Sequence, residues 1–169
     1  FPLVKALELL TLKHPNLSDE IHITVYGRIV EEELRFLNQN RLRRVLEMVD
    51  YVPHDEIVQV MMKADVLIVT LSDLQGADQI IPAKTFEYMA TGNFILAIVP
   101  EGETSRLLRG AYPKSSIVHP NEIEIIAKNI SALIADKKLL NEESKADLSE
   151  YERKRLTEKL SEVLLSVTD

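Results

Sequence analysis

A lysine and a glutamate one helical turn apart, Lys84 and Glu87, carry the most specific chemistry in the sequence. They follow Pro82, which suits a first helical turn because the missing proline N–H is not needed there. The unpaired amides of Ala83 to Thr85 could bind phosphate oxygens, aided by the helix dipole and by the charge of Lys84. The Glu87 carboxylate could accept two hydrogen bonds from a ribose diol. From spacing alone, an ordinary Lys84–Glu87 salt bridge, worth about a few tenths of a kcal/mol, is the favoured alternative.

Two further loops carry residues that could approach an anionic ligand. Gly102 would let a backbone come close to a ligand, and Thr104 or Ser105 could cap a following helix, although a plain strand-to-helix turn is an equal alternative. Gly27 and Arg28 could also meet a phosphate, but a turn with a solvated arginine is the simpler interpretation.

Strands that alternate with helices must position these loops. Apolar, β-rich runs occupy residues 21–26, 45–49, 66–70, 94–99 and 116–119, and amphipathic helical patterns occupy residues 3–12, 31–38, 55–64, 82–90 and 121–135. The runs VLIVT and FILAIV are almost continuously apolar, as in strands buried on both faces. The alternation predicts an α/β fold, with a parallel sheet flanked by helices and right-handed crossovers. Ligands of such sheets bind beyond the carboxyl ends of the strands, where these loops would gather.

Individual residues predict where several helices begin and end. Gly92 suits a left-handed C-cap for the helix that starts near Pro82. Asn121 is expected to cap the helix of residues 121–135, with Glu124 as its capping-box partner. A last helical pattern, about residues 150–167, follows a polar connection, and we expect this helix to pack back on the domain.

Composition limits the partners and the location. A chain of 169 residues fits one domain with its own core, and a formal charge of −7 without a basic run argues against nucleic acid. The sequence has no cysteine, which excludes disulfides and thiolate metal sites and fits a cytoplasmic protein. The histidine spacing matches no zinc motif, there is no Walker or GxGxxG loop, and no apolar stretch is long enough to span a bilayer. Because Phe1-Pro2-Leu3 is neither a signal peptide nor an initiation site, we expect more chain before it.

Two sequence blocks resemble the C-terminal domain of group 1 glycosyltransferases. They are YVPHDEIVQVMMKADVLIVTL at residues 51–71 and IPAKTFEYMATGNFILAIVPEGETSRLL at residues 81–108. The family has a Y-x-P-H-x-E turn before a helix and an A-D-V-L strand, then a P-x-K-x-F-E-Y-x-A-x-G helix. The resemblance implies a Rossmann-like half of a GT-B enzyme, residues 1–169 forming one domain that binds a nucleoside-diphosphate sugar.

The resemblance also implies roles for individual residues. Glu87 matches the second glutamate of the family's E-x7-E motif, which holds the donor ribose, and Lys84 matches a lysine near the phosphates. The first glutamate of that motif falls at Gln79, which can hydrogen-bond sugar hydroxyls but carries no charge. His54 lies in the turn that matches the neighbourhood of the base. The loop that matches the approach to the donor sugar or diphosphate contains Gly102, Glu103 and Thr104.

Other parts of the family pattern are expected outside this chain. A first strand with a glycine-arginine turn would precede Phe1, as would the N-terminal acceptor domain with its usual catalytic histidine. No residue here is therefore assigned to catalysis, and we expect the chain alone to bind nucleotide weakly and transfer nothing. The intact enzyme is expected to transfer a hexosyl group with retention and without a metal or other cofactor, in polysaccharide biosynthesis. Peripheral membrane association of that enzyme is compatible with this expectation.

Three alternatives stay open at this point. A nucleotide-sugar 2-epimerase-like enzyme could share the fold, although the PAKTFEYMATG block argues against it. A non-catalytic GT-B-like domain with a regulatory or assembly role is kept open by Gln79. A Rossmann-like interaction module without a ligand is the third.

Overall fold

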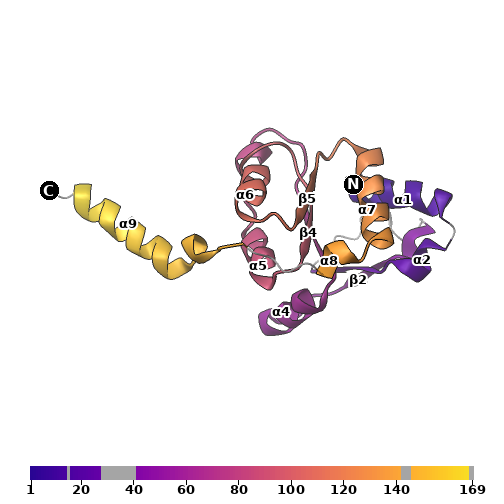
Figure 1. The fold of residues 1–169 in the computed structure, drawn as a ribbon, viewed down its shortest axis with the longest axis horizontal. Helices are drawn as coiled ribbons and strands as arrows, with labels where there is room; N and C mark the ends of the chain where they lie inside the picture. The colour runs from indigo at the N-terminus through magenta and orange to yellow at the C-terminus, as the bar shows by residue number, and fades with distance from the viewer. Residues whose placement is uncertain (15, 28–40, 142–145, 168–169) are drawn as a thin grey trace.

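Five parallel strands among the described residues, with the helices between them, form a Rossmann-like α/β fold (Figure 1). The computed structural model describes residues 1–14, 16–27, 41–141 and 146–167. The predicted helix of residues 31–38 and the candidate ligand residue Arg28 lie outside the described residues. Within the described residues, no helix has the length and apolar character that crossing a membrane requires.

The strands form two small parallel sheets. β1 (Ile23–Tyr26) pairs with β2 (Leu46–Val49), and β3 (Val66–Thr70), β4 (Phe94–Ile98) and β5 (Ser115–Val118) pair in that order. All five predicted strands are confirmed, with ends shifted by a residue or two. The predicted α/β class with parallel strands flanked by helices is confirmed, and the described strands divide between two sheets rather than forming a single one.

The helices lie between and after the strands. Their bounds are α1 Pro2–Lys13, α2 Leu17–Glu20, α4 His54–Lys63, α5 Ala83–Thr91, α6 Glu103–Ala111, α7 Ile123–Ala135, α8 Lys138–Asn141 and α9 Arg153–Val167. Short 3-10 turns occupy η1 Arg41–Arg44, η2 Ala77–Gln79 and η3 Ser149–Tyr151. The helices expected near residues 3–12, 55–64, 82–90 and 121–135 correspond to α1, α4, α5 and α7.

β4 is buried on both of its faces and separates two apolar cores. Leu96 and Ile98 join side chains of α1, α7, β1 and β2 in the first core, so the two sheets share it. Ile95 and Ala97 face the opposite side and join side chains of α5 and α6 in the second core. The continuous apolar run at β4 therefore has the cause that the sequence predicted.

The helix ends follow the predictions only in part. Gly92 caps α5 with a φ of 76°, in the left-handed region, as predicted. The predicted cap at Asn121 is wrong: α7 begins after Glu122 without a side-chain cap, and the Asn121 amide donates instead to Asp73 Oδ2 at 2.8 Å. The cap predicted at Thr104 or Ser105 is also wrong, because α6 begins earlier, after Gly102.

The expectation that the last helix packs back on the domain is wrong. α9 extends away from the sheets and the other helices (Figure 1), and none of its residues is buried. The connection before it does pack: Ala146, Leu148 and Tyr151 lie against the core of α5 and α6, and the Tyr151 ring centre is 5.6 Å from that of Phe86. The apolar side chains that anchor this end of the chain thus belong to the connection rather than to the helix.

Candidate functional site

The loop between β3 and α5 contacts the segments that follow β4 and β5, at the carboxyl ends of these strands. At one point Asp73 reaches the segment after β5, where it accepts the hydrogen bond from Asn121, and His119 Nε2 lies 3.8 Å from the same carboxylate oxygen. The Asn121 backbone N–H donates to His119 Nδ1 at 3.3 Å, which leaves Nε2 to carry the proton in the neutral ring. This cluster could not be found from sequence spacing, because 48 residues separate Asp73 from Asn121.

The same loop also contacts the start of α6. A β-carbon on Gly102 would lie 2.5 Å from the Asp78 Cα, so only glycine permits this approach of two backbones. The buried Thr104 hydroxyl donates to the Ile80 carbonyl at 2.6 Å. The sequence predicted that Gly102 lets a backbone approach a ligand closely; in the structure the close approach is to the protein's own loop at Asp78.

The start of α5 lies directly after this loop. Pro82 is the N-cap residue rather than part of the first turn, and the Thr85 amide donates to the Pro82 carbonyl at 2.9 Å. The expected set of three available amides is therefore reduced to two. Ala83 and Lys84 are exposed, and their amides have no hydrogen-bond partner among the described residues. Two N–H groups at the positive end of a helix remain to meet an anion.

Lys84 and Glu87 do not form the salt bridge that their spacing favoured. Both side chains are exposed, and neither has an ion pair or a side-chain hydrogen bond among the described residues. Burial raises the pKa of the neighbouring Tyr88 phenol, and the negative charge of Glu87 raises it further. A cation and a carboxylate on α5 are thus both available to a ligand.

A bidentate ion pair fixes the turn between β4 and α6. Arg109 Nη1 and Nη2 donate to the two carboxylate oxygens of Glu101, each at 2.7 Å, and the Ser105 hydroxyl lies 3.1 Å from Oε1. The hydrogen bond from Arg109 lowers the pKa of Glu101, with a smaller contribution from Ser105. The neighbouring Glu103 pairs with Arg106 one helical turn along α6. The Glu101–Arg109 pair was not predicted, because a spacing of eight residues across a turn indicates no contact by itself.

The other predicted ligand residues lie at two places. Gln79 ends η2 and is exposed, in the loop before α5. Gly27 follows β1, with a φ of 136°, and its N–H donates to the Val49 carbonyl at 3.0 Å. His54 is the exposed first residue of α4, after β2. The structure thus groups most of the predicted residues beside β3 and β4, and places Gly27 and His54 at the carboxyl ends of the other sheet.

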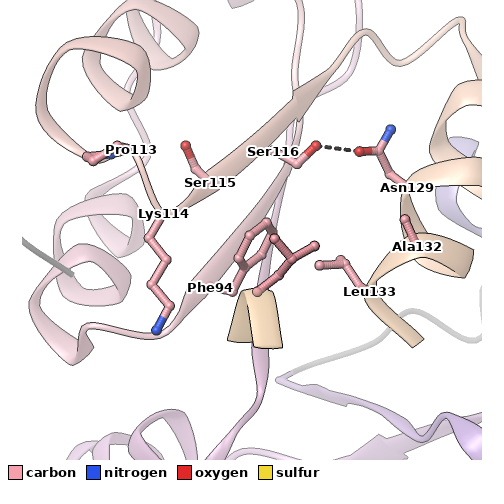
Figure 2. Close-up of a pocket in the computed structure, with 9 residues that line it drawn as sticks. Phe94, Pro113, Lys114, Ser115, Ser116, Asn129, Ala132 and Leu133 are labelled. Carbon is pink, nitrogen blue, oxygen red and sulfur yellow. Dashed lines mark hydrogen bonds between the residues drawn. The ribbon is translucent and has the colours of Figure 1, made fainter. Parts of the chain in front are cut away.

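A cavity of about 310 Å³ lies elsewhere, at the amino ends of β4 and β5 (Figure 2). Its polar side chains are engaged by the protein: Lys114 Nζ donates to the Gly92 carbonyl at 3.0 Å, and the Ser116 hydroxyl donates to Asn129 Oδ1 at 2.6 Å. None of the ligand residues predicted from sequence lines it. The lining residues are Phe94, Pro113, Lys114, Ser115, Ser116, Asn129, Ala132, Leu133 and Leu139.

Neither a family model nor a curated protein matches this chain. The functional interpretation therefore depends on the geometry of the β3–α5–α6 region and on the motif resemblance.

Proposed function

We propose that the chain binds the nucleoside-diphosphate-sugar donor of a retaining glycosyltransferase, as one half of an intact GT-B enzyme. The observation that carries this proposal is that the two charged side chains of α5 are exposed and available to a ligand. Lys84 and Glu87 are exposed and unpaired with each other, on a helix that begins beside the carboxyl ends of a parallel sheet. Open α/β sheets bind their ligands at that edge.

The diphosphate would be held at the start of α5. The amides of Ala83 and Lys84 and the Lys84 ammonium offer three donors for phosphate oxygens. The same groups would stabilise the negative charge that develops on the leaving diphosphate when the glycosidic bond breaks. This role needs no group on the chain that accepts or releases a proton.

The ribose would be held one turn further along α5. The exposed carboxylate of Glu87 can accept hydrogen bonds from two neighbouring hydroxyls, and this is the role that its motif position implies. Gln79 would face the donor sugar with a neutral amide in place of the family's glutamate. Because that substitution removes a charge, the second candidate is a domain that binds nucleotide without transferring sugar. A 2-epimerase-like enzyme is the third candidate.

The proposal requires an acceptor-binding half as partner. α9 leaves apolar side chains exposed, with Leu156, Leu160 and Val163 each about half exposed or more, and we assign this surface to that partner. The edge of β3 away from β4 has no described strand beside it, although VLIVT is nearly all apolar, as in a central strand. The further strand implied by the resemblance would pair there.

Nucleotide binding tests the proposal directly. A nucleoside diphosphate that binds only the folded chain must raise its melting temperature, so we would compare UDP, GDP and ADP with inorganic phosphate. Glu87→Gln should abolish the rise for the nucleotide that produces it. Glu124→Gln, which removes the same charge from the exposed first turn of α7, should leave the rise unchanged.

The intact protein tests the reaction. The sugar should be transferred with its anomeric configuration retained, in the presence of EDTA. An inverted product, or transfer that depends strictly on a divalent ion, would overturn the proposed mechanism. Nucleotide binding without transfer of any donor sugar would instead support the second candidate.

A further inference from the structure

Gln79, the residue expected to face the donor sugar, has an exposed side chain with no hydrogen-bond partner among the described residues. It is the last residue of η2, the short 3-10 turn in the loop between β3 and α5. The Gln79 N–H donates to the Gly76 carbonyl at 3.1 Å, and the Ile80 N–H donates to the Ala77 carbonyl at 3.2 Å. These hydrogen bonds lie within the loop itself, so the place of Gln79 in the molecule depends on what holds the loop.

The start of α6 holds the backbone on each side of Gln79. On one side, Gly102 lies so close to Asp78 that a β-carbon on the glycine would come within 2.5 Å of the Asp78 Cα. On the other side, the Thr104 hydroxyl donates to the Ile80 carbonyl at 2.6 Å. Both neighbours of Gln79 in the sequence are thus fixed through their main chains, and its side chain stays exposed.

We propose that Thr104 is a positioning residue for Gln79, and through Gln79 for the donor sugar; this inference rests on the donor-binding function proposed above. Thr104 is 1% exposed, so water does not compete for its hydrogen bond. A hydroxyl has one hydrogen to donate, and Thr104 gives it to the Ile80 carbonyl. Thr104 therefore acts on a ligand through the loop and not by donating to the ligand itself.

The same anchor relates Gln79 to the groups proposed for the nucleotide. Four residue steps join Gln79 to Ala83, the first residue of α5, so the two lie at most roughly 14 Å apart. α5 has packing of its own, because its Met89 side chain is buried in the second core. Loss of the Thr104 hydrogen bond should therefore loosen Gln79 and leave Lys84 and Glu87 in place.

Amide exchange measured by NMR tests the positioning without any ligand. Thr104→Val keeps the shape of the side chain and removes the hydroxyl. The amides of Gln79 and Ile80 should then exchange about fivefold faster, since a hydrogen bond that holds their turn is lost. The Leu71 amide, which donates to the Ile98 carbonyl at the start of the same loop, should keep its rate.

Calorimetric titration tests the consequence for the donor sugar. We would compare UDP with UDP-glucose, GDP with GDP-mannose and ADP with ADP-glucose, and take the ratio of the two affinities in each pair as the contribution of the sugar. Gln79→Ala should lower that ratio about fivefold for the pair that binds, because a hydrogen bond to a sugar hydroxyl is lost. Thr104→Val should lower it by a similar factor, and the double variant no further, because Thr104 acts through Gln79.

Two further variants separate positioning from a general loss of stability. Thr91→Val removes a hydroxyl that donates to the Tyr88 carbonyl at 2.7 Å, at the other end of α5, so it loses a similar hydrogen bond. It should leave the Gln79 exchange rate and the affinity ratio unchanged. Thr104→Ser, which keeps a hydroxyl, should match the parent within about twofold. Equal weakening of nucleotide and nucleotide sugar in Thr104→Val, or effects of Thr104→Val and Gln79→Ala that multiply, would overturn the inference.

The two proposals fail in different ways. If UDP, GDP or ADP binds through Glu87 but Thr104→Val changes neither the Gln79 exchange rate nor the affinity ratio, the donor proposal stands and the role of Thr104 is wrong. If Thr104→Val speeds exchange at Gln79 but no nucleoside diphosphate binds, the anchor on Gln79 stands and the donor proposal is wrong.

Discussion

Gly102 and Asp78 touch through their backbones. A side chain on residue 102 would place its β-carbon 2.7 Å from the Asp78 carbonyl carbon, well inside van der Waals contact. This contact joins the start of α6 to the loop that precedes α5. The two segments with the most candidate ligand residues are thus held in one arrangement before any ligand arrives.

Gly102→Ala should destabilise the fold, because the Asp78 backbone cannot yield as a flexible side chain would. We expect the free energy of unfolding to fall by about 1–3 kcal/mol, the usual range for overpacking. Urea titration followed by circular dichroism would measure it. Gly110→Ala is the control: nothing lies within 4 Å of its added methyl group, and α6 should gain about 0.5–1 kcal/mol. Equal stability of Gly102→Ala and the parent would show that the loop moves freely.

Glu101 should make the fold sensitive to acid. Its pKa is lowered in the folded state, chiefly by Arg109, so its contribution to stability is present above the ordinary carboxyl pKa. That contribution is lost as the pH falls through the lowered value. The melting temperature of Glu101→Gln should therefore lie below that of the parent at neutral pH and converge with it in acid. Glu158→Gln on α9 is the control for the lost charge, and a constant gap down to low pH would contradict the assignment.

Side chains on α9 should contribute little to the stability of this chain. Leu160 is 59% exposed, so Leu160→Ser should change the free energy of unfolding by less than about 0.5 kcal/mol. Leu108→Ala, in the core under α6, should cost about 2–5 kcal/mol. Chemical denaturation of both variants would measure the contrast. A cost above about 2 kcal/mol for Leu160→Ser would mean that α9 packs on the domain.

Amide exchange should reveal the open edge of β3. The Leu71 amide donates to the Ile98 carbonyl, and alternate residues of a strand point their amides to the same side, so Leu67 and Val69 face β4. Ile68 and Thr70 face the other edge. Hydrogen exchange followed by NMR should find the amides of Ile68 and Thr70 exchanging faster than those of Leu67 and Val69. Equal protection would mean that another segment pairs with β3.

Apolar periodicity accounts for the parts of the fold that could be predicted. The runs at β3 and β4 are long, apolar and bounded by turns, and Gly92 marks the end of α5 because only glycine adopts a left-handed cap without strain. Such patterns depend on a few neighbouring residues. They fix the type and order of the elements, including the α/β class.

Contacts between distant segments could not be predicted in this way. The apolar stripe of α9 predicts that one side of this helix is covered, but it does not indicate by what, and in the structure none of its residues is buried. Asn121 has the residue type of a cap, yet its amide bonds Asp73 across the edge of the sheet. The division of the strands into two sheets depends on which edges meet, a property that no single strand records.

The sequence predicted a ligand site around the start of α5, and binding at that place stays a prediction. The motif predicted Lys84 and Glu87 as ligand residues, and both are exposed and unpaired with each other in the structure. Gly102 and Thr104 were selected for a ligand, and both are engaged in holding the loop. The Thr85 hydroxyl is buried without a hydrogen-bond partner among the described residues, which no spacing in the sequence indicates.

The contact between Phe86 of α5 and Tyr151 is the last packed contact before α9, which begins at Arg153. With 15 residues, α9 is roughly 22 Å long. A rotation of this helix by roughly 10° about Tyr151 would move its C-terminal end, at Val167, by roughly 4 Å. Because no residue of α9 is buried, a rotation of this size would disrupt no packed side chain of the helix itself.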